Sequence, residues 1–266
     1  MFSKITTILI LNLFLASTVV SQEEAYNYLL KKHVNPSTGD VNYCMLKEDK
    51  HYLDTYLNFL AQTSPTEKWS ISKEKAFWMN VYNAYVLKII IDNYPFQKSS
   101  IVKQEKEKNM EVIINYSYKE SKKSSILSVK KEGKSVWEIP FVNVGSKVYT
   151  LNQVEHEIIR KKFKDPRIHA GFNSASKSSP KVAVIAFTEK GVDEQLEVLM
   201  KGFINDTTRN IVTKNKLKLS KIFEWYEGDF TQNESLIDYI NKYVLINIQK
   251  DATISYMEYN WNLNDE

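Results

Sequence analysis

Residues 165–180 read DPRIHAGFNSASKSSP, and the fold class is best predicted by starting from this stretch. Apolar and polar residues alternate over residues 167–172, and a period of two predicts a half-buried strand. Arg167, His169 and Asn173 would then share the polar face of that strand. Four serines between positions 174 and 179 follow at once and predict a turn. We therefore expect a site where this strand opens onto the serine-rich turn.

Helical patterns lie on both sides of this stretch. The longest has apolar residues at helical spacing after Ser72, a candidate N-cap, and Pro95 closes it. Another begins with a capping-box pattern, in which Glu155 follows Asn152 by three residues. The predicted helices span residues 23–32, 49–61, 72–93, 153–163, 192–205 and 235–243.

Short strands are predicted between these helices. A hairpin is expected to turn at Gly145 and Ser146. The predicted strand regions are this hairpin at 136–150, a buried strand at 182–187, and two further short strands at 217–219 and 254–257. This mixture predicts an α+β fold, with helices packed on a small, mainly antiparallel sheet in a single compact domain.

The N-terminal residues have the pattern of a secretory signal peptide. Lys4 is followed by a mostly apolar run, and small residues precede Gln22. Polar residues interrupt the run, which is also short for a membrane span. We therefore expect a signal peptide at residues 1–21 and one exported domain at residues 22–266. The mature protein would be secreted or periplasmic, with no membrane span.

The charge distribution argues against a nucleic-acid-binding protein. The formal net charge is +4, and it falls only to +3 without the predicted signal peptide. Lysines alternate with glutamates in residues 97–135, a Lys- and Ser-rich excursion that we expect on the surface, with a strand at 110–118. Mixed charges of this kind form a solvated face rather than a basic stripe.

Cysteine content excludes two further kinds of site. Cys44 is the only cysteine of the chain, so neither an internal disulfide nor a cysteine-based zinc site can form. Because Cys44 lies between Tyr43 and Met45, we expect it to be a small buried hydrophobic residue.

Two asparagines on the helix at 72–93 are candidates for a site. Asn80 and Asn83 lie three residues apart and therefore share a helix face. Asparagine is a poor helix former, so two on one face need an explanation. They could hydrogen-bond the backbone of a neighbouring loop, as buried amides must find partners. They could also orient a catalytic group or hold a substrate carbonyl.

A second polar stripe is expected on the helix at 153–163. Asn152, His156 and Arg160 follow one another at intervals of four, with Glu155 adjacent. Glu155 and His156 are therefore candidate binding residues. A zinc site would need three protein ligands, and only these two and His169 could supply them, so we expect no metal.

His169 and the serines after it form the third candidate group. The pKa of a histidine lies near neutrality, so His169 could act as a general base. Ser174 and Ser179 are near enough in sequence for either to be its partner, with Asn173 beside them. No G-x-S-x-G pattern is present to mark a nucleophile. The small residues could instead serve only to let the turn pack closely.

Five separated blocks of the chain resemble the domain of unknown function 547 family. They follow one another in order along the chain, from residue 75 almost to the C-terminus. The blocks are KAFWMNVYNAYVLKIIIDNYP (75–95), LNQVEHEIIR (151–160), DPRIHAGFNSASKSSP (165–180), LSKIFEWYEGDF (219–230) and ISYMEYNWNLND (254–265).

This resemblance includes two departures from the family pattern. Family members often carry cysteine at the positions of Ser174 and Ser179. Such cysteines imply a thiol hydrolase with His169 as base and an asparagine or acid as the orienting group. A papain-like arrangement is one fold that this implies, although fold does not fix function. Serine is a weaker nucleophile than cysteine, so this chain would be either a serine variant or an inactive relative.

Two functions are consistent with these residues. The first is a hydrolase-like pocket for an amide or ester, with His169 as base and Ser174 as nucleophile. Arg167 would then hold an anion or carbonyl, and Asn80 or Asn83 would orient the base. The second is a non-catalytic binding module, or pseudoenzyme, that keeps the pocket without the reactive groups.

Contacts of the histidine distinguish these two functions. A serine hydroxyl about 3 Å from a ring nitrogen of His169 would favour the hydrolase. A carboxylate bound to His169, with no serine within reach, would favour the binding module. In both cases we expect a small molecule or peptide as the partner, and no cofactor.

Overall fold

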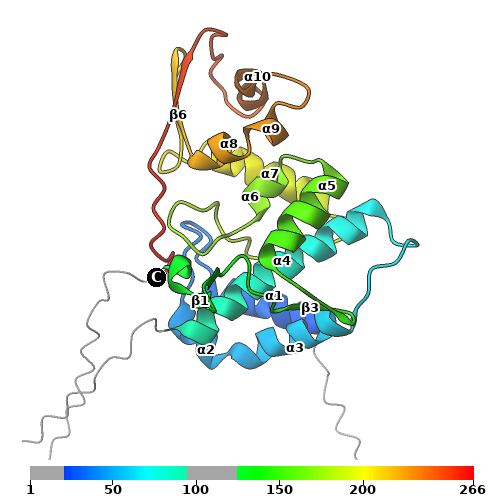
Figure 1. The fold of residues 1–266 in the computed structure, drawn as a ribbon. Helices are drawn as coiled ribbons and strands as arrows, with labels where there is room; N and C mark the ends of the chain where they lie inside the picture. The colour runs from blue at the N-terminus through cyan, green and yellow to red at the C-terminus, as the bar shows by residue number, and fades with distance from the viewer. Residues whose placement is uncertain (1–20, 95–124) are drawn as a thin grey trace, which may run out of the picture.

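The computed structural model describes residues 21–94 and 125–266. The predicted strand at 110–118 lies outside these residues, as do most of the excursion at 97–135 and residues 1–20 of the predicted signal peptide. Figure 1 shows the N-terminal helices in the lower part of the molecule and the C-terminal helices in the upper part. The C-terminal segment runs back from the upper part to the lower one (Figure 1).

Four helices form the N-terminal part of the fold. They are α1 (Gln22–His33), α2 (Tyr43–Glu48), α3 (Lys50–Gln62) and α4 (Ile71–Asn93). The predicted helices at 23–32, 49–61 and 72–93 are thus confirmed. The N-cap of α4 is Ser70 rather than Ser72, because the Ser70 hydroxyl accepts a hydrogen bond from the Lys73 N–H.

Helix α4 is the central element of this part. Most of its residues are buried, and the buried residues lie on all faces of the helix, as Trp78, Met79 and Val81 show. A helix that is apolar all round is expected in the interior of a protein, which explains why α4 has no solvent-facing polar stripe. It contacts α2, α3, α7 and the helix at 153–159.

The helix predicted at 153–163 is present but begins differently. Residues 153–159 form the π-helix η2 (Gln153–Ile159), which continues into α5 (Arg160–Phe163). Its capping box consists of Thr150 and Gln153, whose side chains each accept the other's backbone N–H at 3.0–3.1 Å. Asn152 already has helical backbone angles and makes no side-chain cap, so the predicted Asn152–Glu155 box is wrong.

The strands form three small sheets rather than one. The hairpin predicted at 136–150 is confirmed, with Gly145 in the left-handed region at φ 58°. In the third sheet β5 pairs antiparallel with β6, and β6 pairs parallel with β7. The strands are β1 (Lys130–Lys131), β2 (Lys134–Ser135), β3 (Val142–Val144), β4 (Lys147–Tyr149), β5 (Ile211–Val212), β6 (Lys216–Leu219) and β7 (Thr253–Tyr256). The α+β class is therefore confirmed.

The strand predicted at 167–172 is wrong, because these residues include the one-turn helix α6 (Ile168–Gly171). All four residues of α6 are buried, so the alternation did not mark one exposed and one buried face. Asp165 and Pro166 form the turn before α6: an Asp165 carboxylate oxygen accepts the Arg167 N–H, and the Asp165 carbonyl accepts the Ile168 N–H. This Asp-Pro pair was the sequence signal for a helical start.

The buried strand predicted at 182–187 is also wrong, since these residues form no strand and the chain bends at Val184 and Ile185. Side chains supply the hydrogen bonds that a neighbouring strand would provide. Asn80 bonds both the N–H and the carbonyl of Phe187, each at 2.8 Å. The Asn27 side chain accepts the Ala186 N–H at 2.7 Å. An apolar run alone could not reveal these amide partners.

Four helices build the C-terminal part. The predicted helices at 192–205 and 235–243 correspond to the first and the last of them. They are α7 (Val192–Ile204), α8 (Lys221–Trp225), α9 (Glu227–Phe230) and α10 (Leu236–Asn241). A short helix η1 (Ile126–Ser128) precedes β1 in the lower part.

Two hydrophobic clusters form the core. The first holds the apolar residues of α1 to α4 and of the beginning of α7, and the second holds those of the end of α7, of α8 to α10 and of β6. Helix α6 contributes to both, since Ile168 belongs to the first cluster and Ala170 to the second. The C-terminal segment also returns to the first cluster, where the Tyr43 hydroxyl donates to Asn264 at 2.8 Å.

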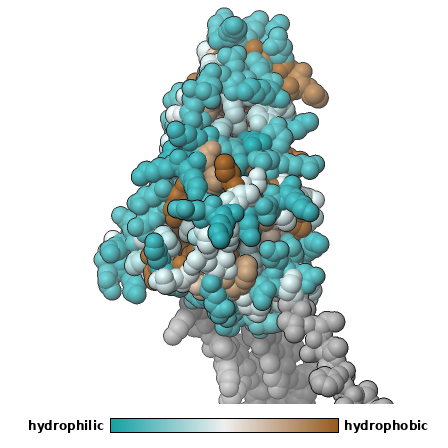
Figure 2. Space-filling model, turned by 90° about the vertical axis from the view of Figure 1, so that its right-hand side faces the viewer, coloured by the Kyte–Doolittle hydropathy of each residue, from teal (hydrophilic) through white to brown (hydrophobic). Residues whose placement is uncertain are grey.

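The surface is mainly hydrophilic on the face in Figure 2, where hydrophobic residues form small separate groups. Cys44 is exposed, so its predicted burial is wrong: it lies on the outer side of α2 while Tyr43 and Leu46 point inward. Among the described residues, none of the helices combines the length and apolar character that crossing a membrane requires.

Close packing of α6 against its neighbours gives a testable prediction. A Cβ on Gly171 would lie 2.6 Å from Met79 Cε, 2.9 Å from Leu196 Cδ2 and 3.0 Å from Phe187 Cζ. Gly171→Ala should therefore lower the free energy of unfolding by about 1–3 kcal/mol through overpacking. Urea denaturation of the purified protein measures this change.

Gly202 on α7 provides a matched control, since a Cβ there would meet nothing within 4 Å. Gly202→Ala should raise the free energy of unfolding by about 0.5–1 kcal/mol, because alanine is the better helix former. A Gly171→Ala variant as stable as Gly202→Ala would show that α6 does not pack this closely.

Candidate functional site

A cavity of about 250 Å³ lies where the two hydrophobic clusters meet. Tyr82 and Phe172 belong to the first cluster, Ile222 belongs to the second, and all three line the cavity. Three tryptophans, three tyrosines and one phenylalanine line it in total. Its polar lining consists of Asn152, Glu155, His156, His169, Ser174 and Ser179.

The π-helix η2 supplies one wall of this cavity. Glu155 is only 7% exposed, and its Oε1 accepts a hydrogen bond from the Tyr226 hydroxyl at 2.6 Å. Burial raises the pKa of Tyr226 well above its usual value, and the neighbouring Glu155 carboxylate adds to this. Tyr226 is therefore the protonated donor of this pair. Wide helical turns of this kind are frequent at functional sites.

The carboxylate of Asp229 holds a second polar group beside this wall. His169 Nε2 lies 2.7 Å from Asp229 Oδ2, and Arg160 binds both Asp229 oxygens at 2.7 and 3.0 Å. Arg160 also lies 3.1 Å from His156 Nδ1. The hydrogen-bonded residues therefore come from η2, α5, α6 and α9.

Burial and hydrogen bonding determine the protonation states of this group. Burial would raise the pKa of Asp229, but hydrogen bonds from His169 and Arg160 outweigh it and hold that pKa well below its usual range. Burial lowers the pKa of His169, and the Asp229 carboxylate opposes this only in part. His169 is therefore neutral at neutral pH, donates from Nε2 to Asp229, and stacks on the Tyr226 ring at 3.9 Å.

Four hydroxyl groups form a hydrogen-bonded cluster, and three of them belong to residues that line the cavity, namely Ser174, Ser179 and Tyr259. Ser174 Oγ lies 2.5 Å from Ser179 Oγ, 3.2 Å from Ser176 Oγ and 3.0 Å from the Tyr259 hydroxyl. Ser176 and Ser179 also lie within 3.3 Å of Tyr259. Ala175 has a positive φ of 53°, an uncommon backbone conformation for alanine that turns the chain between the serines.

These hydroxyls bond one another and not the histidine. In the part of the chain that the structure describes, no hydrogen bond joins His169 to Ser174, Ser176 or Ser179. The histidine and the two outer serines do line the same cavity. The structure therefore brings the predicted base and nucleophile to one cavity without coupling them directly.

Asparagines predicted to belong to the site bind backbone instead. Asn80 holds Phe187, while Asn83 donates to the Gly171 carbonyl and accepts the Asn173 N–H. The Asn173 side chain donates to the Pro180 carbonyl at 2.8 Å and accepts the Ala175 N–H at 2.7 Å. These asparagines therefore hydrogen-bond the backbone of neighbouring segments, which was the first of the two possibilities considered for Asn80 and Asn83. Their hydrogen bonds fix the position of the serine-rich turn.

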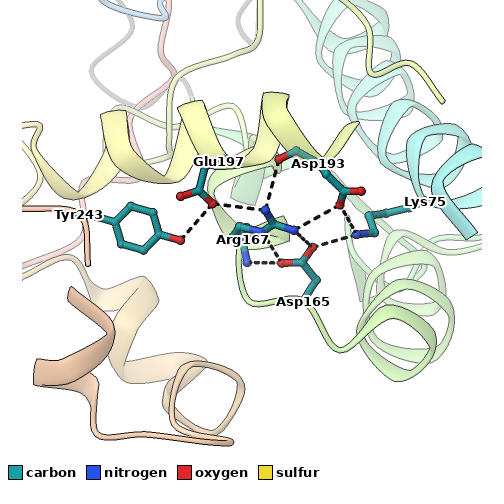
Figure 3. Close-up of polar contacts among 6 residues, drawn as sticks. All are labelled: Lys75, Asp165, Arg167, Asp193, Glu197 and Tyr243. Carbon is teal, nitrogen blue, oxygen red and sulfur yellow. Dashed lines mark hydrogen bonds and ion pairs between the residues drawn. The ribbon is translucent and has the colours of Figure 1, made fainter. Parts of the chain in front are cut away.

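Arg167 lies away from the cavity. Its guanidinium binds Asp165 at 2.9 Å, Asp193 at 3.2 Å and Glu197 at 3.3 Å (Figure 3). Lys75 of α4 completes this group by binding Asp165 and Asp193, each at 2.9 Å. Figure 3 shows that the group joins α4 and α7 to the segment before α6. The structure thus gives Arg167 a bridging position and not the predicted position in the pocket.

Sequence reasoning missed several residues of this site. Tyr226 and Asp229 are separated by more than fifty residues from the histidines that they contact, so no local spacing could connect them. Trp225, Tyr259 and Trp261 lie within the C-terminal blocks that resemble the family, which was the one signal available for them.

No metal site is formed by the residues considered for one. Among the described residues, no group of three or more His, Cys, Asp or Glu side chains is arranged to hold a metal ion. Glu155 is engaged by Tyr226, and His169 by Asp229.

The buried His169 predicts a dependence of stability on pH. Its pKa is lowered in the folded protein, so below about pH 6.5 the unfolded chain binds a proton that the folded one does not. The free energy of unfolding should therefore fall as the pH drops from about 7 to about 5.5, by up to ~1.4 kcal/mol per pH unit. Urea denaturation across this range measures the slope.

His169→Gln should remove this part of the slope while keeping a donor for Asp229. His51→Gln is the matched control, because His51 is exposed on α3 and should leave the slope unchanged. An identical slope in wild type and His169→Gln would contradict the assignment of a neutral, buried His169.

Comparison with known proteins gives one match. The model of the family described as "Protein of unknown function, DUF547" matches residues 66–204. No curated protein and no solved structure matched the chain, so the papain-like fold stays a prediction. The matched range includes α4, η2, α6 and the serine-rich turn, and most of the residues that line the cavity lie within it. Because the match covers more than half of the chain, this protein belongs to the DUF547 family.

Proposed function

We propose that the cavity binds a small molecule and that the protein acts as a binding module rather than as a serine hydrolase. The observation that carries this proposal is the separation of the two polar groups. The Nε2 of His169 is committed to Asp229, and the serine hydroxyls bond one another and Tyr259. A serine nucleophile needs a base within hydrogen-bond reach, and Ser174 has none among these contacts.

The composition of the lining also supports a binding role. Ligand sites are typically concave and rich in aromatic side chains, with a few placed polar groups. All of the lining residues except Trp137 come from the five blocks in which this chain resembles its family. The cavity is below the usual ~300–1,000 Å³ range for drug-sized ligands, which favours a metabolite-sized one.

Hydrolysis of an amide or ester is the second candidate function. It is favoured by the hydrogen bond between Asp229 and His169, because a carboxylate that orients a neutral histidine is how a general base is prepared. The positive φ of Ala175 beside Ser174 is also a strained conformation of the kind found at functional sites. A small movement on substrate binding would have to bring Ser174 to the histidine.

Export of the protein is proposed from the sequence alone. The apolar run after Lys4 and the small residues before Gln22 are the support for removal of residues 1–21 and for a secreted or periplasmic location.

A screen with a blocked cavity tests the binding proposal. Asn152 lines the cavity, and its side chain makes no cap, so Asn152→Phe should fill the space without removing a bond. Compounds that raise the melting temperature of the wild type should lose that effect in Asn152→Phe. Glu157→Phe, on the exposed side of the same helix, is the matched control and should keep it.

Turnover assays on the wild type, Ser174→Ala and His169→Ala decide between binding and hydrolysis. If the protein is a binding module, any turnover of an ester and amide panel by the wild type should persist unchanged in Ser174→Ala and in His169→Ala. Turnover that both substitutions abolish, with folding intact, would contradict the binding module and establish the hydrolase.

A further inference from the structure

The cavity contains one acidic side chain without a strong cationic partner. Among the described residues that line it, Glu155 is the one acid, and there is no lysine or arginine. The Tyr226 hydroxyl bonds Glu155 Oε1, and His156 Nδ1 lies 3.9 Å from the same oxygen. His169, the other lining histidine, is neutral at neutral pH. Glu155 is therefore the principal charge that a ligand would meet.

Arg160 follows Glu155 along the same continuous helix, and it is already engaged by Asp229. It binds Asp229 through two hydrogen bonds, at 2.7 and 3.0 Å, so that these two charges offset each other. A buried carboxylate without a paired cation is unfavourable. A cationic ligand in the cavity would supply the charge that Glu155 lacks.

Aromatic rings provide a second feature suited to a cation. Trp225, Tyr259 and Trp261 contact one another, with ring centroids 4.5–5.9 Å apart, and all three line the cavity. The faces of tryptophan and tyrosine rings attract ammonium and guanidinium groups. The protein already uses this interaction nearby, since the Arg160 guanidinium lies 4.9 Å from the centre of the Tyr226 ring.

From these features we infer that the cavity takes an organic cation, of the substituted ammonium class. The positive group would lie against the aromatic rings with Glu155 as its counter-charge, and the ligand would be of metabolite size. An anion would face the Glu155 carboxylate, and a neutral sugar could stack on the rings but would leave that charge unpaired. This inference rests on the proposed binding function and names its ligand class.

A matched pair of probes tests the charge requirement. Choline and 3,3-dimethylbutan-1-ol have nearly the same shape, but only choline carries the positive charge. Each is titrated against the full-length protein, with tryptophan fluorescence as the readout because three tryptophans line the cavity. Choline should bind about tenfold or more tightly than the alcohol.

Two variants on the same helix test the part played by Glu155. Glu155→Gln should reduce the preference for choline to about twofold or less while the alcohol still binds. Glu157→Gln removes an exposed carboxylate two residues away and should keep the full preference. Should Glu155→Gln fail to fold, the comparison of the two probes on the wild type decides the inference.

The remaining outcomes overturn the inference in distinguishable ways. Equal affinity of the wild type for both probes would exclude an organic cation but leave the binding function in place. If Glu155→Gln still binds choline with the full preference over the alcohol, then Glu155 is not the counter-charge. If neither probe binds saturably, the organic-cation class is rejected. The binding proposal would then still stand if a sugar or an ester binds the wild type but not Asn152→Phe.

Discussion

The carboxylate of Asp229 is the contact on which the candidate site depends. It comes from α9 in the C-terminal part, and it binds His169 of α6 and Arg160 of α5 at the same time. Without this carboxylate, the buried His169 and the half-buried Arg160 would lose their hydrogen-bond acceptor. Leaving buried donors unpaired lowers stability by more than the net contribution of the hydrogen bonds themselves. Because His169 also stacks on Tyr226, this one carboxylate fixes the wall of the cavity next to Glu155.

A comparable ionic group stabilises the other side of α6. Arg167, Asp165 and Lys75 join α4 to the segment before α6, and Asp193 extends the contact to α7 (Figure 3). Helix α6 is thus held between the two hydrophobic clusters by the ionic group before it, by the hydrogen bond from His169 to Asp229 and by close packing at Gly171. The serine-rich turn that follows is held in place by the hydrogen bonds of Asn83 and Asn173.

How far the sequence could predict this structure depended on the length of each pattern. Long amphipathic or apolar runs such as that of α4 specified their helices, because many residues share one periodicity. The six residues from Arg167 were too few, and burial on all sides of α6 made their alternation uninformative. His169, Ser174 and Glu155 could be named as candidates from the sequence, in separate groups, and the structure places all three in the lining of one cavity, whereas Asp229 joins them only through tertiary folding.

Indole signals in a ¹⁵N-labelled sample test most directly whether this cavity is the binding site. The chain has five tryptophans, of which Trp137, Trp225 and Trp261 line the cavity, whereas Trp69 and Trp78 do not. Titration with choline should shift the three cavity indole N–H signals saturably and leave the other two unchanged. Saturable shifts confined to Trp69 and Trp78, or no shift of any of the five, would contradict the account.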